Sequence, residues 1–406
     1  MKRRWLLLAI AALALTLALG TALAESEDGL WQYWDCNDGS VQIIGYQGSD
    51  VALVIPEEID GRPVSKLHST LFMQTIRSIT LPDSLIYEGN NPFQYAKELE
   101  DIIVSDTNPV YKTVDGVLFS KDGTCLIAYP RGSKLPAYTV PEGVTDIGAY
   151  AFYNTQELWN VVLPSTLLRI GEAAFCQSEE LRSVEIQPGL ISIGDRAFSN
   201  CKLTFIMLPD GLVSIGESAF SSTRLSEIII PDSVKEMGTR AFWCCQRLQK
   251  VTLPEGFTSI GDRMFELCTA LTEINIPDSV TEIANSAFDG CTGLTSVKLP
   301  QGITIGSYTF SDCSGLTSIV LPKDVTLRHG AFLRCKGLTS VEFPEGITTI
   351  GGDSLFSGCS GLTSLVIPDG VTDIDRYVFK GCTGLTSVVI PEGVTEIKDS
   401  TFNSQG

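Results

Sequence analysis

A repeat of 22 to 24 residues governs the larger part of the chain and constrains its fold more than any other feature. Its clearest copy reads L-T-S-V-V-I-P-E-G-V-T-E-I over residues 385–397, followed by a short polar step and a Phe. Copies share a Pro at positions 141, 164, 209, 231, 254, 277, 300, 322, 344, 368 and 391, and Gln187 takes that place once. A fixed period of this length is the mark of a solenoid rather than of separate globular domains.

Two further columns run in phase with the Pro. The first consists of Phe152, Phe175, Phe198, Phe220, Phe242, Phe265, Phe288, Phe310, Phe332, Phe356, Phe379 and Phe402. The second lies three residues after most of those Phe and consists of Cys201, Cys245, Cys268, Cys291, Cys313, Cys335, Cys359 and Cys382. Each coil therefore buries one residue of every column against the same column in the next coil, and only a stack of coils is stable.

The same unit predicts local structure. The alternating, β-branched segment before the Pro is typical of a strand, and identical strands stacked coil on coil form a parallel sheet. The Pro ends the strand because it has no N–H to donate to the ladder. The x-x-A-F step that follows predicts a short turn or a single helical turn.

The motif I/L-P-x-x-V-x-x-I-G-x-x-A-F-x-x-C-x-x-L is nearly intact at residues 276–294. It resembles the repeat of the BspA-like leucine-rich-repeat surface antigens (LRR type 5), over about residue 54 to the end. The resemblance implies a strand-dominated, right-handed α/β leucine-rich-repeat solenoid. Its parallel sheet is expected on the concave face, with short helical or 3-10 turns opposite. It also implies a bacterial adhesion or recognition protein, without naming the ligand.

Breaks in the repeat suggest five segments. Residues 1–24 form a signal peptide, 25–54 an N-terminal cap hairpin, 55–93 the first repeats, 94–136 a hairpin insert with its turn at Asp122-Gly123, and 137–406 an array of about twelve coils. The insert either shapes a binding face or decorates the solenoid.

The first residues read as an export signal. Lys2, Arg3 and Arg4 precede an apolar run over residues 5–19 and a small-residue end at Ala24, where cleavage is expected. The run is too short to span a bilayer, so a secreted or cell-surface protein is predicted. The net charge of -19 becomes -22 without the three basic residues, since residues 1–24 hold no Asp or Glu. Such a charge argues against nucleic acid or membrane-surface partners, and no membrane insertion is expected.

The sequence gives little support to disulfide bonds in the Cys column or to a catalytic, cofactor or metal site. The eight cysteines of the second column, the ladder cysteines, are expected to be buried free thiols. Disulfide pairing among the other four, Cys36, Cys125, Cys176 and Cys244, stays open. The two histidines, His68 and His329, neighbour no nucleophile in a familiar spacing, so no enzyme, cofactor or metal site is expected. Acids recur after the column Pro (Glu142, Asp210, Asp232, Glu255, Asp278, Glu345, Asp369 and Glu392) and indicate a solvated stripe.

A partner is expected on outward strand positions, because alternate residues of a strand point away from the core. The candidates are Trp159, Arg182, Glu185, Phe205, Met207, Ile229, Asn275, Lys298 and Glu342. Exposed aromatics and Arg are typical of binding hot spots, although the same side chains can simply fill space at a sheet edge. The sequence thus favours an extracellular protein that binds a protein or glycan. The alternative is a structural or self-assembling scaffold of the cell envelope.

Overall fold

The computed structural model describes residues 23–69, 75–86, 90–398 and 400–402. These residues form about 15 turns of a strand-rich β-solenoid with parallel sheets, and no helix occurs among them. The expected signal peptide lies outside the described residues, apart from Leu23 and Ala24. Both of these belong to strand β1, so cleavage after Ala24 would remove them from it.

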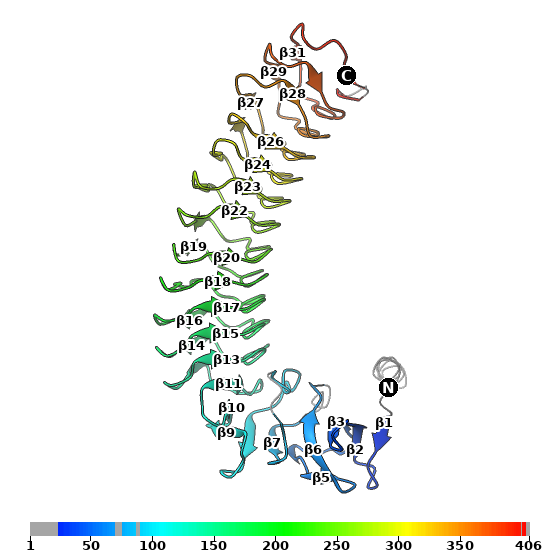
Figure 1. Ribbon diagram of the computed structural model, residues 1–406, viewed down its shortest axis with the longest axis vertical. Coiled ribbons are helices and arrows are strands. Elements are labelled where there is room, and N and C mark those ends of the chain that lie inside the picture. The colour runs from blue at the N-terminus through cyan, green and yellow to red at the C-terminus, as the bar shows by residue number, and fades with distance from the viewer. Residues whose placement is uncertain (1–22, 70–74, 87–89, 399, 403–406) are drawn as a thin grey trace. The chain divides into compact units, whose positions relative to one another are not determined.

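The chain divides into two compact units (Figure 1). Unit 1 comprises the residues up to 136 together with 143–158, and unit 2 comprises residues 137–142 together with 159 onward.

Unit 1 holds three groups of strands. The first is the sheet β1-β2-β3-β6-β5, the second is β4-β7-β8, and the third contains the pairs β9–β10, β10–β11 and β11–β13. The strands are β1 (Leu23–Glu25), β2 (Trp31–Asp35), β3 (Val41–Tyr46), β4 (Ala52–Val54), β5 (Glu58–Ile59), β6 (Arg62–Leu67), β7 (Ser78–Leu81), β8 (Asp101–Val104), β9 (Tyr111–Val114), β10 (Val117–Ser120), β11 (Cys125–Ala128) and β13 (Asp146–Ile147).

Tight antiparallel hairpins interrupt the solenoid pattern in unit 1. Asp60 and Gly61 join β5 to β6 with φ of 51° and 73°, the left-handed values that a two-residue hairpin turn requires. The β10–β11 hairpin turns at Asp122-Gly123, where the Gly123 N–H donates to the Ser120 carbonyl. The Asp122 side chain accepts bonds from Ser120 and Thr124, which fixes this turn.

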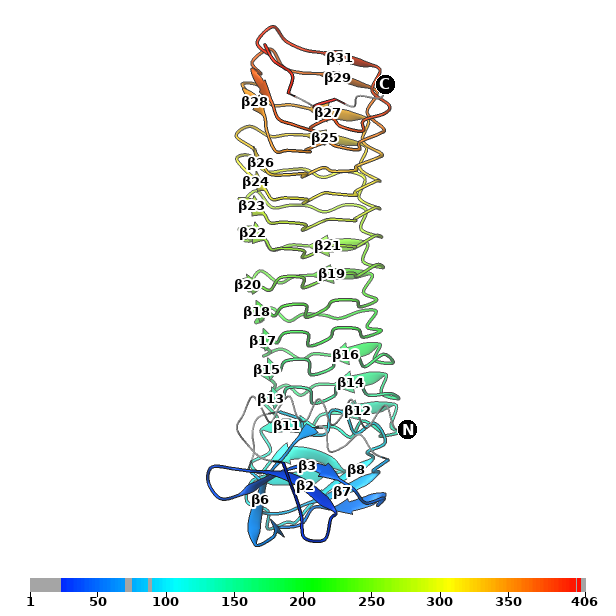
Figure 2. The same ribbon diagram turned by 90° about the vertical axis from the view of Figure 1, so that its right-hand side faces the viewer.

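Unit 2 carries two columns of short strands, which Figure 2 shows side by side along the unit. The three-residue column contains β12 (Ala137–Thr139), β14 (Asn160–Val162), β16 (Ser183–Glu185), β19 (Glu227–Ile229), β21 (Lys250–Thr252), β25 (Ser318–Val320), β27 (Ser340–Glu342), β29 (Ser364–Val366) and β31 (Ser387–Val389). The two-residue column contains β15 (Arg169–Ile170), β17 (Ser192–Ile193), β18 (Ser214–Ile215), β20 (Glu236–Met237), β22 (Ser259–Ile260), β23 (Glu282–Ile283), β24 (Thr304–Ile305), β26 (Thr326–Leu327), β28 (Thr349–Ile350) and β30 (Asp373–Ile374).

All strand pairs of unit 2 are parallel and in register. Val161 lies opposite Val184 between β14 and β16, and Ile193 lies opposite Ile215 between β17 and β18. The β-branched segment before the Pro builds the first column, as the sequence predicts. The second column, built by the V-T-x-I segment after the Pro, was not anticipated as strand.

The turn that carries the Phe column is not helical, which corrects the expectation of helical or 3-10 turns. From Phe152 to Phe379, the residues two before and two after each Phe are left-handed, for example Arg263 (φ 54°) and Leu267 (φ 63°) around Phe265. These positions break the run of right-handed residues that a helix needs. The turn bonds instead to the next one, since the Phe265 N–H donates to the Ala287 carbonyl at 2.8 Å.

The Phe column forms one continuous stack inside unit 2. From Phe175 to Phe402, neighbouring rings lie 5.1 to 6.0 Å apart with interplanar angles of 2° to 18°. All but the last are almost completely buried. The predicted stacking of the Phe column, called the spine, is therefore confirmed. Because the rings are parallel, they hold neighbouring turns in register.

The ladder cysteines are buried thiols, as predicted. Each donates a hydrogen bond to the carbonyl of the Phe one turn earlier, at 3.0 to 3.3 Å. No disulfide occurs among the described cysteines. Where the column lacks Cys, Ser178 and Thr223 take its place and are equally buried.

Candidate binding surface

The strand face consists of the outward residues of the three-residue column and of the equivalent positions in neighbouring turns. In many turns the residue two before the column Pro lies between two buried residues and therefore points outward. Ile229 shows the pattern: Ile228 and Ile230 are 2% exposed, whereas Ile229 is 66% exposed.

The sequence-predicted candidates at the start of unit 2 lie together on this face. Trp159 is 48% exposed, Phe205 53% and Met207 68%. The Trp159 carbonyl accepts the N–H of Arg182 one turn later, and the Arg182 carbonyl accepts the N–H of Thr204 in the turn after that. Trp159, Arg182 and the segment with Phe205 and Met207 therefore occupy three consecutive turns, and Ile229 occupies the next.

Charged side chains border these apolar groups. Arg182 lies 3.5 Å from a carboxylate oxygen of Glu180, which also contacts Lys202. These contacts hold the pKa of Glu180 below its usual range. Glu185 is exposed on β16, opposite Val162 of β14. Exposed large apolar groups with charged residues on the same turns are the kind of mixture found at protein-binding surfaces.

The remaining candidates lie further along the same face. Asn275 and Lys298 are opposite each other across a parallel bridge, and Glu342 lies opposite Val320. All three candidates are exposed. They continue the column but do not join the apolar group at Phe205, since several turns separate them.

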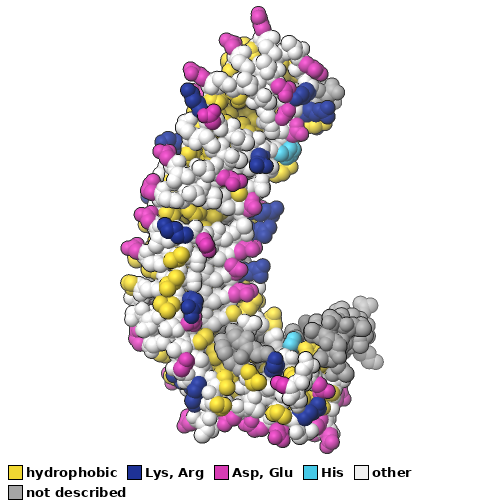
Figure 3. All heavy atoms as spheres, viewed as in Figure 1, with side chains coloured by type: hydrophobic (Ala, Val, Ile, Leu, Met, Phe, Trp, Pro, Cys, Tyr) yellow, Lys and Arg dark blue, Asp and Glu magenta, His cyan; other side chains and the backbone are white. Residues whose placement is uncertain are grey.

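The prediction did not include three aliphatic residues of the same column. Val320, Val366 and Val389 are exposed, and Val366 lies directly opposite Val389. Their position two before the column Pro already marks them as outward. Figure 3 shows such apolar side chains on the surface of unit 2, interspersed with charged ones.

The acids that follow the column Pro are exposed, as the solvated-stripe interpretation requires. Glu142 also binds the next turn, since its carboxylate accepts the N–H and the hydroxyl of Ser165, at 3.2 and 3.0 Å. Within the described residues, no group of three or more His, Cys, Asp or Glu is arranged to hold a metal.

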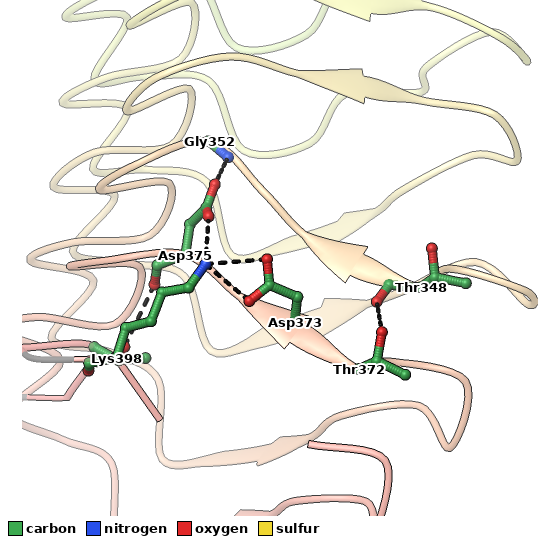
Figure 4. A network of polar contacts seen from close by, with 7 residues as sticks. Thr348, Gly352, Thr372, Asp373, Asp375 and Lys398 are labelled. Atoms are coloured by element: carbon green, nitrogen blue, oxygen red, sulfur yellow. Dashed lines mark hydrogen bonds and ion pairs between the residues drawn. The ribbon is translucent and has the colours of Figure 1, made fainter. Parts of the chain in front are cut away.

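A polar cluster near the last described turns was not foreseen (Figure 4). The Lys398 ammonium lies 2.8 Å from Asp373 and 3.2 Å from Asp375, which raises the pKa of Lys398. Asp375 also accepts the Gly352 N–H at 3.0 Å. Since its members satisfy one another, the cluster fastens adjacent turns together. Nothing in the sequence marks it, because Lys398 has no counterpart in the repeat.

Neither histidine belongs to the strand face. His329 packs against the Tyr308 ring at 5.0 Å in unit 2, and His68 packs against Trp34 at 5.5 Å in unit 1. Among the described residues, no helix has the length and apolarity to cross a bilayer.

Solved structures of other leucine-rich-repeat proteins resemble this fold. A leucine-rich repeat protein from Bacteroides ovatus matches with 24% identity and a TM-score of 0.52, over 70% of this chain and 87% of its own. A leucine rich cell surface protein from Faecalibacterium prausnitzii matches with 25% identity and a TM-score of 0.44, over 94% and 91%. The pneumococcal vaccine antigen PcpA matches with 16% identity and a TM-score of 0.32, over 76% and 98%. No curated protein sequence matches the chain.

The family comparison covers more than half of the chain. The profile of the BspA type leucine rich repeat region matches residues 131–223, 213–327 and 303–405. These ranges contain the Pro, Phe and Cys columns that build unit 2. The chain therefore belongs to the BspA type leucine-rich-repeat family.

Proposed function

We propose that the chain is an exported, non-catalytic binding protein that recognises an extracellular protein or glycan through the strand face, which the sequence predicts to be concave. The observation that carries this proposal is the exposure of Phe205 and Met207 on one turn and of Ile229 on the next, each more than half accessible. Burying large apolar side chains against a partner gives about 25 cal/mol for each Å² removed from water.

The neighbouring residues support specific recognition rather than nonspecific hydrophobic association. Trp159 adds an aromatic surface, and Arg182 adds a guanidinium whose ion pair with Glu180 is largely exposed. Trp and Arg are enriched among residues that dominate binding energy. Proteins that stay monomeric rarely leave such groups together on one regular face.

Comparing two sets of substitutions tests this proposal. The triple variant F205S/M207S/I229S removes the apolar group, and I191S/V213S removes exposed apolar side chains that flank the two-residue column instead. Immobilised chains carrying each set are exposed to matrix and cell-surface proteins and to a glycan array. A partner retained by the wild type and the control, but lost by the triple variant, supports the proposal.

The outcome also distinguishes the scaffold alternative. If the wild type captures no partner but self-associates with concentration in sedimentation, and the triple variant does not, the face serves assembly instead. If both sets of substitutions retain the same partner, binding lies elsewhere and the proposed surface is wrong.

A further inference from the structure

A groove of about 450 Å³ lies on the turns that carry the Phe column, and none of its described lining residues belongs to a strand of unit 2. The lining comes from three consecutive turns, beside Phe332, Phe356 and Phe379. Its volume falls in the range of small-molecule sites, which is roughly 300 to 1,000 Å³. The groove is therefore large enough to hold a ligand independently of the strand face.

The groove exists because the middle turn carries small side chains. Ser357 directly follows the Phe of its turn, in the place that Leu333 holds one turn earlier and Lys380 one turn later. Ser354 lies two residues before that Phe, where the next turn has Tyr377. The two serines therefore leave a gap beside larger side chains. Neither serine hydroxyl bonds to another described residue, so both can donate to a ligand or accept from it.

Arg334, in the earlier turn, is held in place. Its Nε and one terminal nitrogen donate to the Asp312 carboxylate at 2.6 to 3.1 Å. Its stem lies against Gly358, where an added Cβ would stand 3.0 Å from the Arg334 Cγ. The other terminal nitrogen, Nη1, donates to no described residue, so the guanidinium keeps donors for a ligand.

In the later turn, an aromatic ring and a positive charge lie together. The Lys380 ammonium lies 5.0 Å from the centre of the Tyr377 ring. Tyr377 is 38% exposed, and Lys380 is exposed and forms no ion pair with a described residue. The face of an aromatic ring is negative and attracts the C–H groups of a sugar ring, whereas an ammonium attracts an anion. The pair therefore offers contacts for a sugar ring and for a negative charge at the same place.

We propose that this groove binds a sugar chain that contains uronate residues. A sugar ring packs against Tyr377, and its carboxylate pairs with Lys380. The sugar hydroxyls bond to Ser354, Ser357 and Arg334. A uronate carries its carboxylate directly on the sugar ring, as the closeness of the ammonium to the aromatic ring requires. The proposal does not depend on the strand face and adds a second binding surface to unit 2.

Calorimetry with three short probes on the full chain tests the site. Trigalacturonate carries uronate rings, its trimethyl ester keeps the rings without the charge, and tricarballylate keeps three carboxylates without a sugar ring. Short probes are chosen because the net charge of -19 would repel a long polyanion. Trigalacturonate should bind one to one, at least five-fold tighter than either comparison probe. No binding at about 5 mM, or equal affinity for either comparison probe, would overturn the proposal.

A lysine variant locates the charge. K380M keeps the apolar stem and removes the ammonium, and should weaken trigalacturonate binding about five-fold, the value of one exposed charge pair. K250M is the matched control, because Lys250 is exposed on β21 and does not line the groove. Equal affinities of the two variants for trigalacturonate would contradict the assignment of the carboxylate to Lys380.

A tyrosine variant locates the sugar ring. Y377S removes the aromatic ring, and Ser354 shows that serine fits the same place in a turn. Y308S is its control, because Tyr308 holds this place three turns earlier, is also 38% exposed and does not line the groove. Y377S should weaken trigalacturonate binding at least five-fold and Y308S less than two-fold. Equal losses would overturn the proposed stacking.

A third variant closes the groove. S357W places a large ring where Trp243 occurs natively, directly after the Phe of an earlier turn, so a turn of this kind accommodates the side chain. It should abolish trigalacturonate binding while the melting temperature stays within a few degrees of the wild type. A folded S357W variant that binds trigalacturonate like the wild type would show that the sugar does not occupy this groove.

Discussion

The thiol of Cys291 donates a hydrogen bond to the carbonyl oxygen of Phe265, 3.1 Å away and one turn earlier in the solenoid. Cys291 is fully buried, and Phe265 is stacked between Phe242 and Phe288. Each cysteine of the column thus joins its own turn to the backbone of the Phe in the preceding turn. Cysteine serves here as a small apolar residue that also satisfies a buried carbonyl.

Replacing Cys291 tests the value of this bond. C291A removes both the sulfur and the donor, and should lower the free energy of unfolding by about 1–3 kcal/mol. C291S should cost less, because a hydroxyl can donate to the same carbonyl and Ser178 already occupies this column natively. Denaturant unfolding measures both. A serine variant less stable than the alanine variant would contradict this account.

Thiol reactivity provides an independent check. Burial raises the pKa of Cys245 to about 11 and that of Cys382 to about 12, so little thiolate is present at pH 8. A thiol reagent should label no more than the three partly exposed cysteines, Cys36, Cys125 and Cys244, in the native protein. All twelve should react after denaturation. Rapid labelling of ladder cysteines in the native state would show that the spine opens.

The Phe stack should be the most sensitive element of unit 2. F265A removes a fully buried ring and should cost about 3–5 kcal/mol, with faster amide hydrogen exchange in the adjacent turns. F205A makes the same chemical change at a ring that is 53% exposed. The second variant should unfold like the wild type, and equal losses from both would contradict the stacked core.

Asp289 gives a pH-dependent prediction. Burial raises the pKa of Asp289 above its ordinary value of 3.8, so its ionisation costs stability as the pH rises through the unfolded and then the folded pKa. D289N should therefore raise the melting temperature at pH 7 but not at pH 3. Asp312 is the opposite case, since hydrogen bonds from Arg334 lower its pKa, and D312N should lower the melting temperature at pH 7.

Lys398 should secure the turns that end the described chain. K398M removes the ion pairs with Asp373 and Asp375, and should speed amide exchange in residues 373–398 while leaving earlier turns unchanged. In 1 M salt the wild type should approach the variant, because exposed ion pairs are screened. Identical exchange in both proteins at low salt would show that the cluster does not fasten these turns.

The repeat predicts most of unit 2 because the residues of each column pack against one another in successive turns. Phe265, Cys291 and Val251 could be placed in the core from their spacing alone, since only one face of each turn is buried. The turn conformation could not be predicted in this way. Arg263 and Leu267 carry no preference for left-handed φ, and only their bonds to the next turn impose it.

The sequence predicts which residues form the candidate surface but not which partner they bind. Alternation along the strand marks Met207 and Ile229 as outward, whereas nothing in a single sequence states what contacts them.

The left-handed positions beside each Phe have a consequence for how such a protein can diversify. Because bonds to the neighbouring turn set the backbone there, Arg240, Ser286, Tyr308 and Leu267 all adopt the same conformation. Side chains of very different size and charge are therefore accepted at these sites, as long as they are not β-branched, since a left-handed φ is most strained for β-branched residues. Lineages that inherit this architecture can exchange the side chains they display, or copy an entire turn, without redesigning the interior.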